Sequence, residues 1–540
     1  MFTRDELRAI PLFAELDDKE LDYLAKTSAD LRLVPGEYVL HEGETRRALF
    51  ILVEGRIEVT KIVDGIERVV GVRDPGESFG ELPVVLNTPF VVSFRAAQQS
   101  RVMRIEARDF HIVAASAPQV SAVVGAAALE RVGGLQDIAA APSQPLLAVI
   151  GPQWDNATHE LRDFLQRNSV EFDWIAPEDP AVSYPIVRLR DGTNLRDPSI
   201  RDIAKAIDLC VTPTRAIYDV AIVGGGPAGL AAAVYGASEG LSTALLEREA
   251  PGGQAGTSSR IENYLGFPYG ISGDELAHRA LQQAKRLGAE IVVTRTVQTI
   301  DLSSRALRLD EDEAVYAKAI VIANGVSWRH LDIASLDRLH GRGVYYGAAP
   351  GESRSAQGAD AYIIGGGNSA GQAALNLSSF ANSVTLLIRG DTLAKSMSHY
   401  LIEQLKTKSN VSVETRSEIA NAYGDDHLEA IDVTNRTTGE TTRRGASALF
   451  ILIGADAETV WLPPQIGRDE RGYVITGRDV LAGGSWRAGR DPYLLETTVP
   501  GVFAVGDVRA GSVKRVAAAV GEGSMAIAFV HQYLASVQEV

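Results

Sequence analysis

The sequence predicts a multidomain chain in which a small β-barrel or jelly roll with flanking helices precedes a small α/β module and two larger α/β domains. The first observation is length, because 540 residues are enough for about three or four domains of about 150 residues each. The second is a run of short strands and glycine turns before residue 130, which is typical of β-barrels. The third is a pair of glycine fingerprints, beginning at Gly224 and Gly365, within a long alternation of strand and helix patterns.

The composition excludes several classes of function. The net charge is −16, whereas nucleic acid and anionic membranes are bound through basic surface, so neither is expected as a partner. The single cysteine, Cys210, excludes an intrachain disulfide, a C-x-x-C redox pair and a zinc site built on thiolates. The nine histidines show no ligand spacing, so no metal site is predicted.

Two segments bear on localisation. Residues 1–13 carry charged side chains and lack an apolar core of signal-peptide length. The long uncharged stretch Val220–Ser238 contains a glycine turn, so we interpret it as strand, turn and helix rather than a membrane span. We therefore expect a soluble, cytoplasmic protein, and the low cysteine count fits a reducing compartment.

Residues 1–132 are predicted to form the β-barrel or jelly roll. Turn signals such as Pro35-Gly36 and Pro75-Gly76 separate short apolar runs, with helical patterns at both ends. The expected strands are Tyr38–His41, Ala48–Val53, Arg56–Lys61, Val69–Val72 and Ser100–Ile105. Residues 133–145, rich in small residues and ending near two prolines, are predicted to be a linker.

Residues 146–212 are predicted to form the small α/β module. The pattern gives strands at 146–150, 172–175 and 185–189, with helices at 157–168 and 200–207. This order resembles the thioredoxin/glutaredoxin fold, with Tyr184-Pro185 where that family has its cis-proline. The turn after the first strand, residues 151–156, contains no cysteine, so the resemblance implies a fold and not disulfide chemistry.

The first fingerprint follows the strand Asp219–Val223 and opens an alanine-rich helix. Gly224 permits the tight turn, Gly226 lets the backbone approach a pyrophosphate, and Gly229 lets the helix pack closely on the strand. The free N–H groups and the dipole at the helix start favour an anion there. The next strand ends in Glu247, which is where an acid hydrogen-bonds an adenosine ribose. The pattern therefore predicts a Rossmann-like dinucleotide site that includes Pro227 and Ala228.

The second fingerprint predicts a site for a nicotinamide nucleotide. Its turn consists of Gly365, Gly366 and Gly367, and the helix opens with Asn368, Ser369 and Ala370. The following strand ends in Arg389, and an arginine there suits a 2′-phosphate, whereas an acid would suit a free hydroxyl. We therefore expect NADPH as the nucleotide. Arg389 has only Lys395 nearby in sequence, so we expect partial discrimination against NADH.

Residues 216–540 closely resemble the thioredoxin-reductase-like flavoproteins, of the pyridine nucleotide-disulphide oxidoreductase family. The resemblance rests on Pro251-Gly252-Gly253-Gln254, on residues 261–268, on Val321-Ile322-Ala323-Asn324-Gly325 and on residues 500–507. It implies an FAD-binding domain at 216–330 and 456–540, an NAD(P)H-binding domain at 331–455, and a homodimer.

The resemblance also implies further cofactor-binding residues. Asp507 would bind a ribityl hydroxyl, and the helix near 517–529 would point its N-terminus at the flavin, where a positive dipole end favours the reduced anion. The other implied residues are Arg248, Gly253, Gln254, Asn263, Val297, Ala323, Gly325, Gly506, Arg515, Val516 and Ala517.

The dithiol that such reductases carry before the second fingerprint is missing. The matching stretch begins at Val344, and its two cysteine positions are Gly347 and Pro350. The chain therefore cannot run an internal dithiol relay. Cys210 is most simply a small buried hydrophobe, with an intersubunit disulfide as the alternative.

The first domain resembles a cyclic-nucleotide-binding fold. Phe79-Gly80-Glu81-Leu82 followed by Thr88-Pro89 is similar to the phosphate-binding cassette, in which the glutamate holds a ribose hydroxyl. The arginine that would neutralise the cyclic phosphate is replaced by Phe90, while Arg95 lies in the following strand pattern. Loss of a charge-assisted phosphate contact costs about 1.5–3 kcal/mol, so we expect the fold to be retained with its ligand lost or changed.

The sequence thus predicts an oxidoreductase in which NADPH reduces FAD and electrons pass to an external small-molecule or protein acceptor. The acceptor could be a ferredoxin, a flavodoxin, a quinone, an external disulfide or oxygen. No side chain is predicted to act as a catalytic acid, base or nucleophile. The alternatives are a thioredoxin-type disulfide reductase that uses external thiols and a non-catalytic nucleotide-binding sensor.

Overall fold

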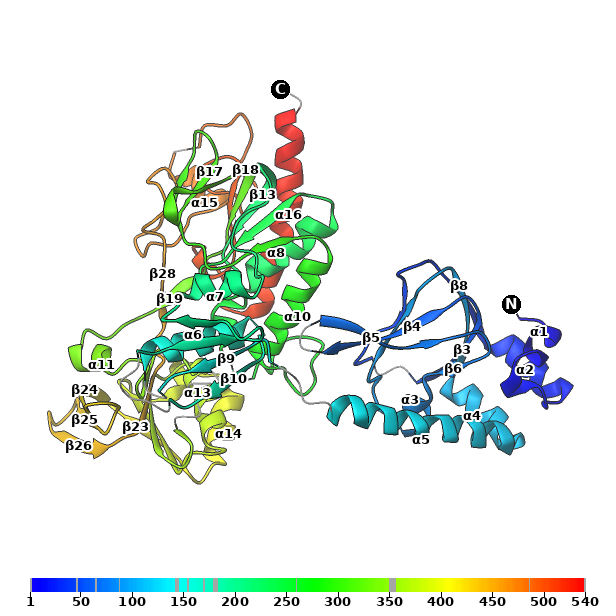
Figure 1. Cartoon of the computed structure of the whole chain (residues 1–540). Coiled ribbons are helices and arrows are strands. Elements are labelled where there is room, and N and C mark those ends of the chain that lie inside the picture. Colours follow the sequence, from blue (N-terminus) through cyan, green and yellow to red (C-terminus); the bar gives the residue numbers. More distant parts are fainter. Residues whose placement is uncertain are drawn as a thin grey trace. The chain divides into compact units, whose positions relative to one another are not determined.

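The computed structural model describes most of the chain. It covers residues 2–44, 47–63, 66–86, 88–140, 145–152, 155–168, 170–177, 183–258, 260–348, 356–484 and 486–538. The chain divides into two compact units, Met1–Pro145 and Leu146–Val540, whose elements are labelled in Figure 1.

Unit 1 consists of two antiparallel four-stranded sheets with helices at both ends. The sheets have the strand orders β1-β8-β3-β6 and β2-β7-β4-β5. The strands are β1 (Ala29–Leu33), β2 (Tyr38–Leu40), β3 (Ala48–Glu54), β4 (Ile57–Val63), β5 (Ile66–Arg73), β6 (Ser78–Phe79), β7 (Ser93–Ala96) and β8 (Ser100–Glu106). The helices are α1 (Arg4–Arg8), η1 (Pro11–Phe13), α2 (Asp18–Thr27), α3 (Glu81–Leu86), α4 (Ala107–Ser116) and α5 (Pro118–Ala140).

Local sequence accounts for the helices and the core of unit 1. Thr3 and Asp17 cap α1 and α2, each in a reciprocal capping box with the glutamate three residues later. One core cluster lies between the strands and contains Phe50, Phe79 and Phe94. Helix α5 runs to Ala140, so most of the stretch predicted to be a linker is helical. Its alanine, leucine and glutamine residues favour the helix enough to outweigh Gly133 and Gly134.

Unit 2 begins with residues 146–212, called the module below. Its sheet has the order β10-β9-β11-β12, in which β10 is parallel to β9 and the other pairs are antiparallel. The elements are β9 (Leu147–Ile150), α6 (Asn156–Arg167), β10 (Phe172–Ile175), β11 (Ile186–Leu189), β12 (Asn194–Arg196) and α7 (Ile200–Ala206). The Tyr184–Pro185 peptide bond is cis. The module shares its hydrophobic core with the domain that follows and forms one unit with it.

The first α/β domain is built on a seven-stranded sheet, which is parallel across β15-β14-β13-β18-β29. Helices α8, α10 and the long α16 cover one face of this sheet (Figure 1). The strands are β13 (Ile217–Val223), β14 (Thr243–Leu246), β15 (Glu290–Val292), β16 (Val297–Asp301), β17 (Ala306–Leu309), β18 (Ala314–Ile322) and β29 (Val502–Ala504). The helices are α8 (Pro227–Ser238), α9 (Gly253–Gly256), α10 (Gly273–Arg286), η2 (Asp310–Asp312), α15 (Arg478–Ala482), η5 (Gly506–Val508) and α16 (Val516–Gln538).

The second α/β domain is inserted between β18 and β29 and has a parallel sheet of order β20-β27-β21-β22-β23. Its strands are β20 (Val344–Tyr345), β21 (Asp360–Ile364), β22 (Ser383–Ile388), β23 (Val411–Thr415), β24 (Ser417–Tyr423), β25 (Ala430–Asn435), β26 (Thr441–Gly445) and β27 (Ala448–Ile451). Its helices are α11 (Ala334–Arg338), α13 (Asn368–Leu377), η4 (Leu393–Lys395) and α14 (His399–Lys406). The chain enters and leaves this domain through the antiparallel pair β19 (Val326–Trp328) and β28 (Ala455–Ala457).

Candidate functional site

The first glycine turn forms an open cradle between β13 and α8. Gly224 has φ +104°, and a Cβ there would lie 2.6 Å from the carbonyl oxygen of Ala323, so only glycine fits. A Cβ on Gly229 would overlap the carbonyl oxygen of Gly224, which explains the close packing of helix on turn. Gly226 is the N-cap of α8, and a Cβ there would meet nothing within 4 Å. The turn is therefore closely packed against the protein at Gly224 and Gly229, and it has open space at Gly226.

Glu247, at the end of β14, is buried beneath this turn. Its carboxylate accepts hydrogen bonds from the backbone N–H of Gly225 (2.7 Å) and of Glu249 (2.9 Å). Burial raises the pKa of this carboxyl group, while the two N–H donors act in the opposite direction. Glu247 thus holds the glycine turn in place, a contact that the motif alone does not reveal.

Several residues from distant parts of the chain meet at this cradle. A Cβ on Gly253 would lie 3.0 Å from Gly226 Cα, so the second loop approaches the first turn closely. Gln254 donates from Nε2 to the carbonyl oxygen of Val326, next to Gly325 and the turn that follows β18. The sequence-predicted residues Gly253, Gln254, Ala323 and Gly325 are therefore brought together at the carboxyl edge of the parallel sheet, the usual place for ligands in such sheets.

The segment Gly506–Asp507 joins the same site from the C-terminal part of the chain. A Cβ on Gly506 would lie 3.0 Å from the Cβ of Ala228, at the start of α8. The buried carboxylate of Glu522 accepts a hydrogen bond from Gly506 N (2.7 Å) and pairs with Arg509. Burial raises the pKa of Asp507, against the charge of Lys514.

Helix α16 begins at Val516, so that Arg515 and Ala517 flank its N-terminus beside this segment. The positive end of the helix dipole therefore lies where an anionic ligand group would be favoured.

The second glycine turn repeats the geometry of the first in the inserted domain. Gly365 has φ +141°, and a Cβ there would overlap the carbonyl oxygen of Leu452. Gly367 is the N-cap of α13 and Ala370 is buried against the turn. Asn368 accepts at Oδ1 from the N–H of Ser398 (2.7 Å), while Ser369 follows it in the first turn of the helix. A second helix N-terminus is thus presented at the end of a parallel strand.

Arg389 follows β22 directly and is exposed. Its guanidinium makes no hydrogen bond or ion pair with any residue in the described part of the chain. By contrast, Arg416, at the end of the neighbouring β23, pairs with Asp391 (2.7 Å). Arg416 is thus a second cation near this turn that sequence reasoning missed, because β22 and β23 are adjacent only in the sheet.

Three predicted cofactor residues lie apart from these contacts. Arg248 forms an ion pair with Glu458 (2.6 Å), just beyond β28. The side chain of Val297, the first residue of β16, is buried in the core. Asn263 lies in the loop between Ile261 and Ile271, which form an isolated β-bridge. Glu522 and Arg509 support the site but carry no motif signal, because a glutamate within a helix pattern has many ordinary roles.

The segment that matches the family's dithiol contains no thiol in its described part. Gly347 is buried with φ +146°, whereas Pro350 lies outside the described residues. Cys210 lies at the junction of the module and the first α/β domain, with its Sγ 3.8 Å from Glu290 Oε1. Burial raises the pKa of this thiol, and Glu290 adds to the effect.

The cassette in unit 1 is occupied by the protein's own side chains. Glu81 is 1% exposed and pairs with Arg131 of α5, and it also accepts from Ser78 Oγ (2.6 Å). Phe90 is buried, with its ring at edge angles to the rings of Phe50 (6.3 Å) and Phe94 (6.4 Å).

Arg95 does not reach the cassette, because its guanidinium pairs with Glu58 (2.8 Å) and Glu67 (2.7 Å). The groups that a cyclic nucleotide would need are therefore either missing or already paired.

Two further classes of site are absent from the described residues. No group of three or more histidine, cysteine, aspartate or glutamate side chains there is arranged to hold a metal ion. Within the same residues, no helix combines the length and apolar character needed to cross a membrane.

Comparison with known proteins agrees with this geometry. A structure of T. acidophilum thioredoxin reductase superposes with a TM-score of 0.53 at 29% identity, covering 60% of this chain and 100% of that one. A Lactococcus lactis thioredoxin reductase also gives a TM-score of 0.53, at 31% identity, and covers 59% of this chain and 99% of that one. The thioredoxin reductase of Peptoclostridium acidaminophilum is 31% identical over 325 residues, which are 59% of this chain and 97% of that protein.

Two family models match different parts of the chain. Residues 31–116 match the cyclic nucleotide-binding domain, in agreement with the resemblance of unit 1. Residues 218–523 match the pyridine nucleotide-disulphide oxidoreductase model, so the predicted similarity to thioredoxin reductases and the predicted oxidoreductase class are confirmed. FAD and NADPH, the two predicted cofactors, are those of the thioredoxin reductase family. This chain belongs to the pyridine nucleotide-disulphide oxidoreductase family.

Proposed function

We propose that this protein is an NADPH-dependent FAD oxidoreductase that delivers electrons to an external acceptor without an internal dithiol. The observation that carries the proposal is the pair of glycine cradles, each at a helix N-terminus, in a chain that has one cysteine. Two such cradles suit two dinucleotides, and a single cysteine cannot form the dithiol.

The first cradle fits FAD. Gly226 leaves open space for a pyrophosphate, and the N-terminus of α8 supplies N–H donors toward it. Glu247 would hold the adenosine ribose with the lone pairs that the backbone of Gly225 and Glu249 leaves free. Asp507 and the N-terminus of α16 would orient the flavin end. When bound, FAD supplies the step from two-electron to one-electron chemistry.

The second cradle fits NADPH. Gly367 and the N-terminus of α13 would receive the pyrophosphate. The exposed Arg389, which is not committed to any carboxylate among the described residues, would pair with the 2′-phosphate. Arg416 lies near this turn but is held by Asp391, so it would contribute less.

The acceptor is proposed to take electrons directly from the flavin. Ferredoxin, flavodoxin, a quinone and oxygen need no thiol on the enzyme, whereas disulfide exchange needs a thiolate. The raised pKa of Cys210 disfavours a thiolate at neutral pH. A thioredoxin-type reductase that uses external thiols, and a nucleotide-binding sensor without turnover, are the alternatives.

The domain assignments follow the same reasoning. We assign unit 1 as a cyclic-nucleotide-binding-like β-barrel or jelly roll that does not bind cyclic nucleotides. We assign the module as a cysteine-free thioredoxin-like fold, which its strand order β10-β9-β11-β12 supports. Residues 216–330 and 456–540 would bind FAD, residues 331–455 would bind NADPH, and the protein would act as a homodimer.

The test is flavin identity followed by turnover. Purified protein should be yellow and release FAD on heating, and NADPH should bleach the flavin in a stopped-flow experiment. Ferricyanide or a quinone should then restore the oxidised spectrum. Release of FMN, or of no flavin, would refute the FAD assignment, and a flavin that NADPH does not reduce would favour the sensor.

A further inference from the structure

Helix α6 of the module contacts both nucleotide-binding domains. It has 12 residues and is therefore about 18 Å long. At its C-terminal end, Arg167 pairs with Glu249 (3.0 Å) and donates to the carbonyl oxygen of Ala250 (3.3 Å), both in the first α/β domain. At its N-terminal end, Asn156 and His159 contact the inserted domain. One helix thus spans the two domains.

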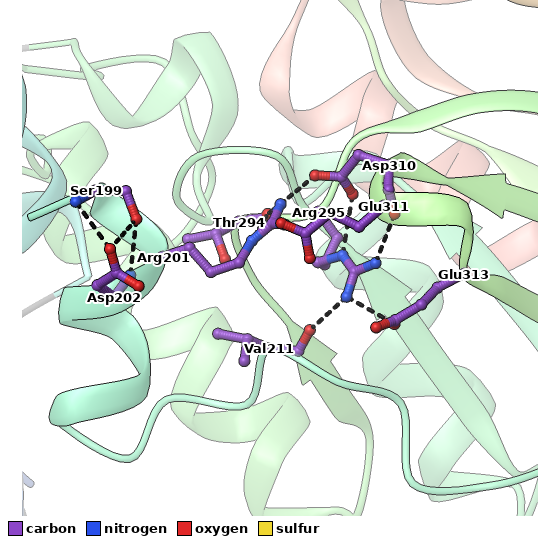
Figure 2. Close-up of polar contacts among 9 residues, drawn as sticks. All are labelled: Ser199, Arg201, Asp202, Val211, Thr294, Arg295, Asp310, Glu311 and Glu313. Atoms are coloured by element: carbon purple, nitrogen blue, oxygen red, sulfur yellow. Dashed lines mark hydrogen bonds and ion pairs between the residues drawn. The ribbon is translucent and has the colours of Figure 1, made fainter.

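The module is held firmly against the first α/β domain. Two guanidinium groups, of Arg201 from α7 and of Arg295, converge on the carboxylate of Asp310 (Figure 2). Arg295 is 2% exposed and also binds Glu313 (2.8 Å) and the carbonyl oxygen of Val211 (3.2 Å). Together with the shared hydrophobic core, these bonds make the module a rigid part of this domain.

The contact between α6 and the inserted domain is small and lies at residues 341–345 of that domain. Arg342 donates from Nε to Asn156 Oδ1 (3.3 Å), and the ring of His159 lies 6.0 Å from the ring of Tyr345. A Cβ on Gly341 would lie 3.2 Å from Asn156 Oδ1, so the missing side chain lets the helix approach. Residues 341–345 lead directly into Gly347, the position that matches the first cysteine of the family's dithiol.

We propose that the module is a built-in occupant of this face of the inserted domain, covering residues 341–345. In this arrangement Asn156 and His159, in the first turn of α6, contact the residues that precede Gly347. A protein acceptor is therefore excluded from this face and reaches the flavin from elsewhere. The inference deepens the proposed function, on which it rests.

The same contact limits movement between the domains. The chain passes between the first α/β domain and the inserted domain through β19 and β28, a two-stranded connection of the kind that acts as a hinge. Helix α6 adds a third, non-covalent connection at a distance from the hinge.

Cross-linking of the full-length chain tests the contact directly. In a Cys210→Ser background, Asn156→Cys with Arg342→Cys should be joined within one chain by a short bismaleimide in most molecules. The control pairs Asn156→Cys with Thr438→Cys, in the turn between β25 and β26 of the same domain, and should cross-link poorly. Equal yields for both pairs, or no cross-link for the first, would overturn the proposal.

Hydrogen exchange with matched variants supplies an independent readout. Asn156→Lys places a cation against Arg342, whereas Ala157→Lys adds the same charge to the same exposed helical turn without that contact. Asn156→Lys should speed exchange in peptides covering residues 339–347 about fivefold, the value of roughly one hydrogen bond. Ala157→Lys should leave it unchanged. The same rate in all three proteins would refute the docking.

Flavin content separates this inference from the proposed function. If the parent protein lacks flavin but cross-links as expected, the proposed function fails and the docking stands. If the parent is yellow and reduced by NADPH but residues 156 and 342 do not cross-link, the docking fails and the proposed function stands.

Discussion

The cassette of unit 1 and the glycine cradles of unit 2 are both ligand-binding motifs, yet their polar groups are in opposite states. In the cassette, Glu81 already pairs with Arg131, and the ring of Phe90 is packed into the core. In the first cradle, Gly226 faces open space and the helix N-terminus behind it keeps free donors. The glutamate of the cassette is thus paired within the protein, whereas the Cβ position of Gly226 in the first cradle has open space around it.

The difference shows why a motif match alone does not indicate whether the polar groups of a site are paired. A motif in the sequence indicates a backbone geometry that suits a ligand. Whether the side chains still offer unpaired groups depends on contacts from elsewhere in the chain, such as the one Arg131 makes from α5. The family match for residues 218–523 is therefore stronger evidence for ligand binding than the match for residues 31–116.

The largest expected effect comes from filling the first cradle. Gly226→Val should weaken FAD binding by at least about 3 kcal/mol, roughly a hundredfold or more, because the side chain occupies the space left for the pyrophosphate. The apoprotein should stay stable, since a Cβ at this position meets nothing within 4 Å. Fluorescence titration of the apoprotein with FAD gives the affinity.

Gly445→Val is the control for Gly226→Val, because Gly445 is also open at its Cβ but lies in β26. It should leave FAD affinity unchanged. Equal flavin content in the Gly226→Val variant and the parent would remove Gly226 from the site.

The next effect concerns the ion pair that fills the cassette. Arg131→Ala leaves the buried Glu81 carboxylate without its cation and should destabilise unit 1 by about 2–3 kcal/mol. Hydrogen exchange in peptides covering Ser78–Leu86 should accelerate accordingly. Arg56→Ala is the control, since its ion pair with Asp74 is long (4.0 Å) and exposed, and it should cost little. Similar exchange in both variants would mean that the Arg131 pair is not structural.

Substitutions that free Glu81 and add a phosphate contact test whether the cassette can bind a cyclic nucleotide. Calorimetry of the parent protein should detect no binding of cyclic AMP. Phe90→Arg combined with Arg131→Ala supplies a phosphate contact and frees Glu81, so it should improve binding by about 1.5–3 kcal/mol. Phe90→Arg alone should gain less, because Glu81 stays occupied. Tight binding of cyclic AMP by the parent would refute the filled cassette.

A comparable effect is expected at the second cradle. Arg389→Ala should weaken NADPH by about 1.5–3 kcal/mol and NADH much less, because only NADPH offers a 2′-phosphate. Arg416→Ala should have a smaller effect, since Arg416 is held by Asp391. Flavin reduction followed at several concentrations of each nucleotide measures both affinities. An equal loss for the two nucleotides would show that Arg389 does not read the phosphate.

The sequence was sufficient for the motifs and for many of the elements, because these depend on local patterns, although β1 and β6 were not predicted. The strand before the first fingerprint was predicted to within two residues, and a helix was predicted to open directly after each glycine turn, since the glycines mark the turn. Helix α5 extends into the stretch predicted to be a linker, because the local signal from Gly133 and Gly134 was weaker than the helix propensity around them.

Contacts between distant segments could not be predicted in this way. Glu522 supports Gly506, Arg131 fills the cassette and Asn156 meets Arg342, and each pair is separated by many residues without a shared motif. Such pairs follow from the packing of helices and sheets, which a single sequence does not encode in a readable pattern. The roles predicted for the individual cofactor residues stay predictions until a nucleotide-bound structure is compared.

The smallest effect is expected at the single cysteine. Cys210→Ser should change NADPH-driven reduction of ferricyanide or a quinone by less than about 0.5 kcal/mol, as for a substitution away from the reacting groups. The thiol has a raised pKa because it is half-buried and lies beside Glu290, so little thiolate is present at neutral pH. Thioredoxin reduction should be weak in both proteins, since disulfide exchange needs a thiolate. Steady-state rates with each acceptor measure this. If Cys210→Ser abolished turnover, or if the parent reduced thioredoxin at an ordinary enzymatic rate, electrons would have to pass through sulfur, and direct transfer from the flavin to the acceptor would be refuted.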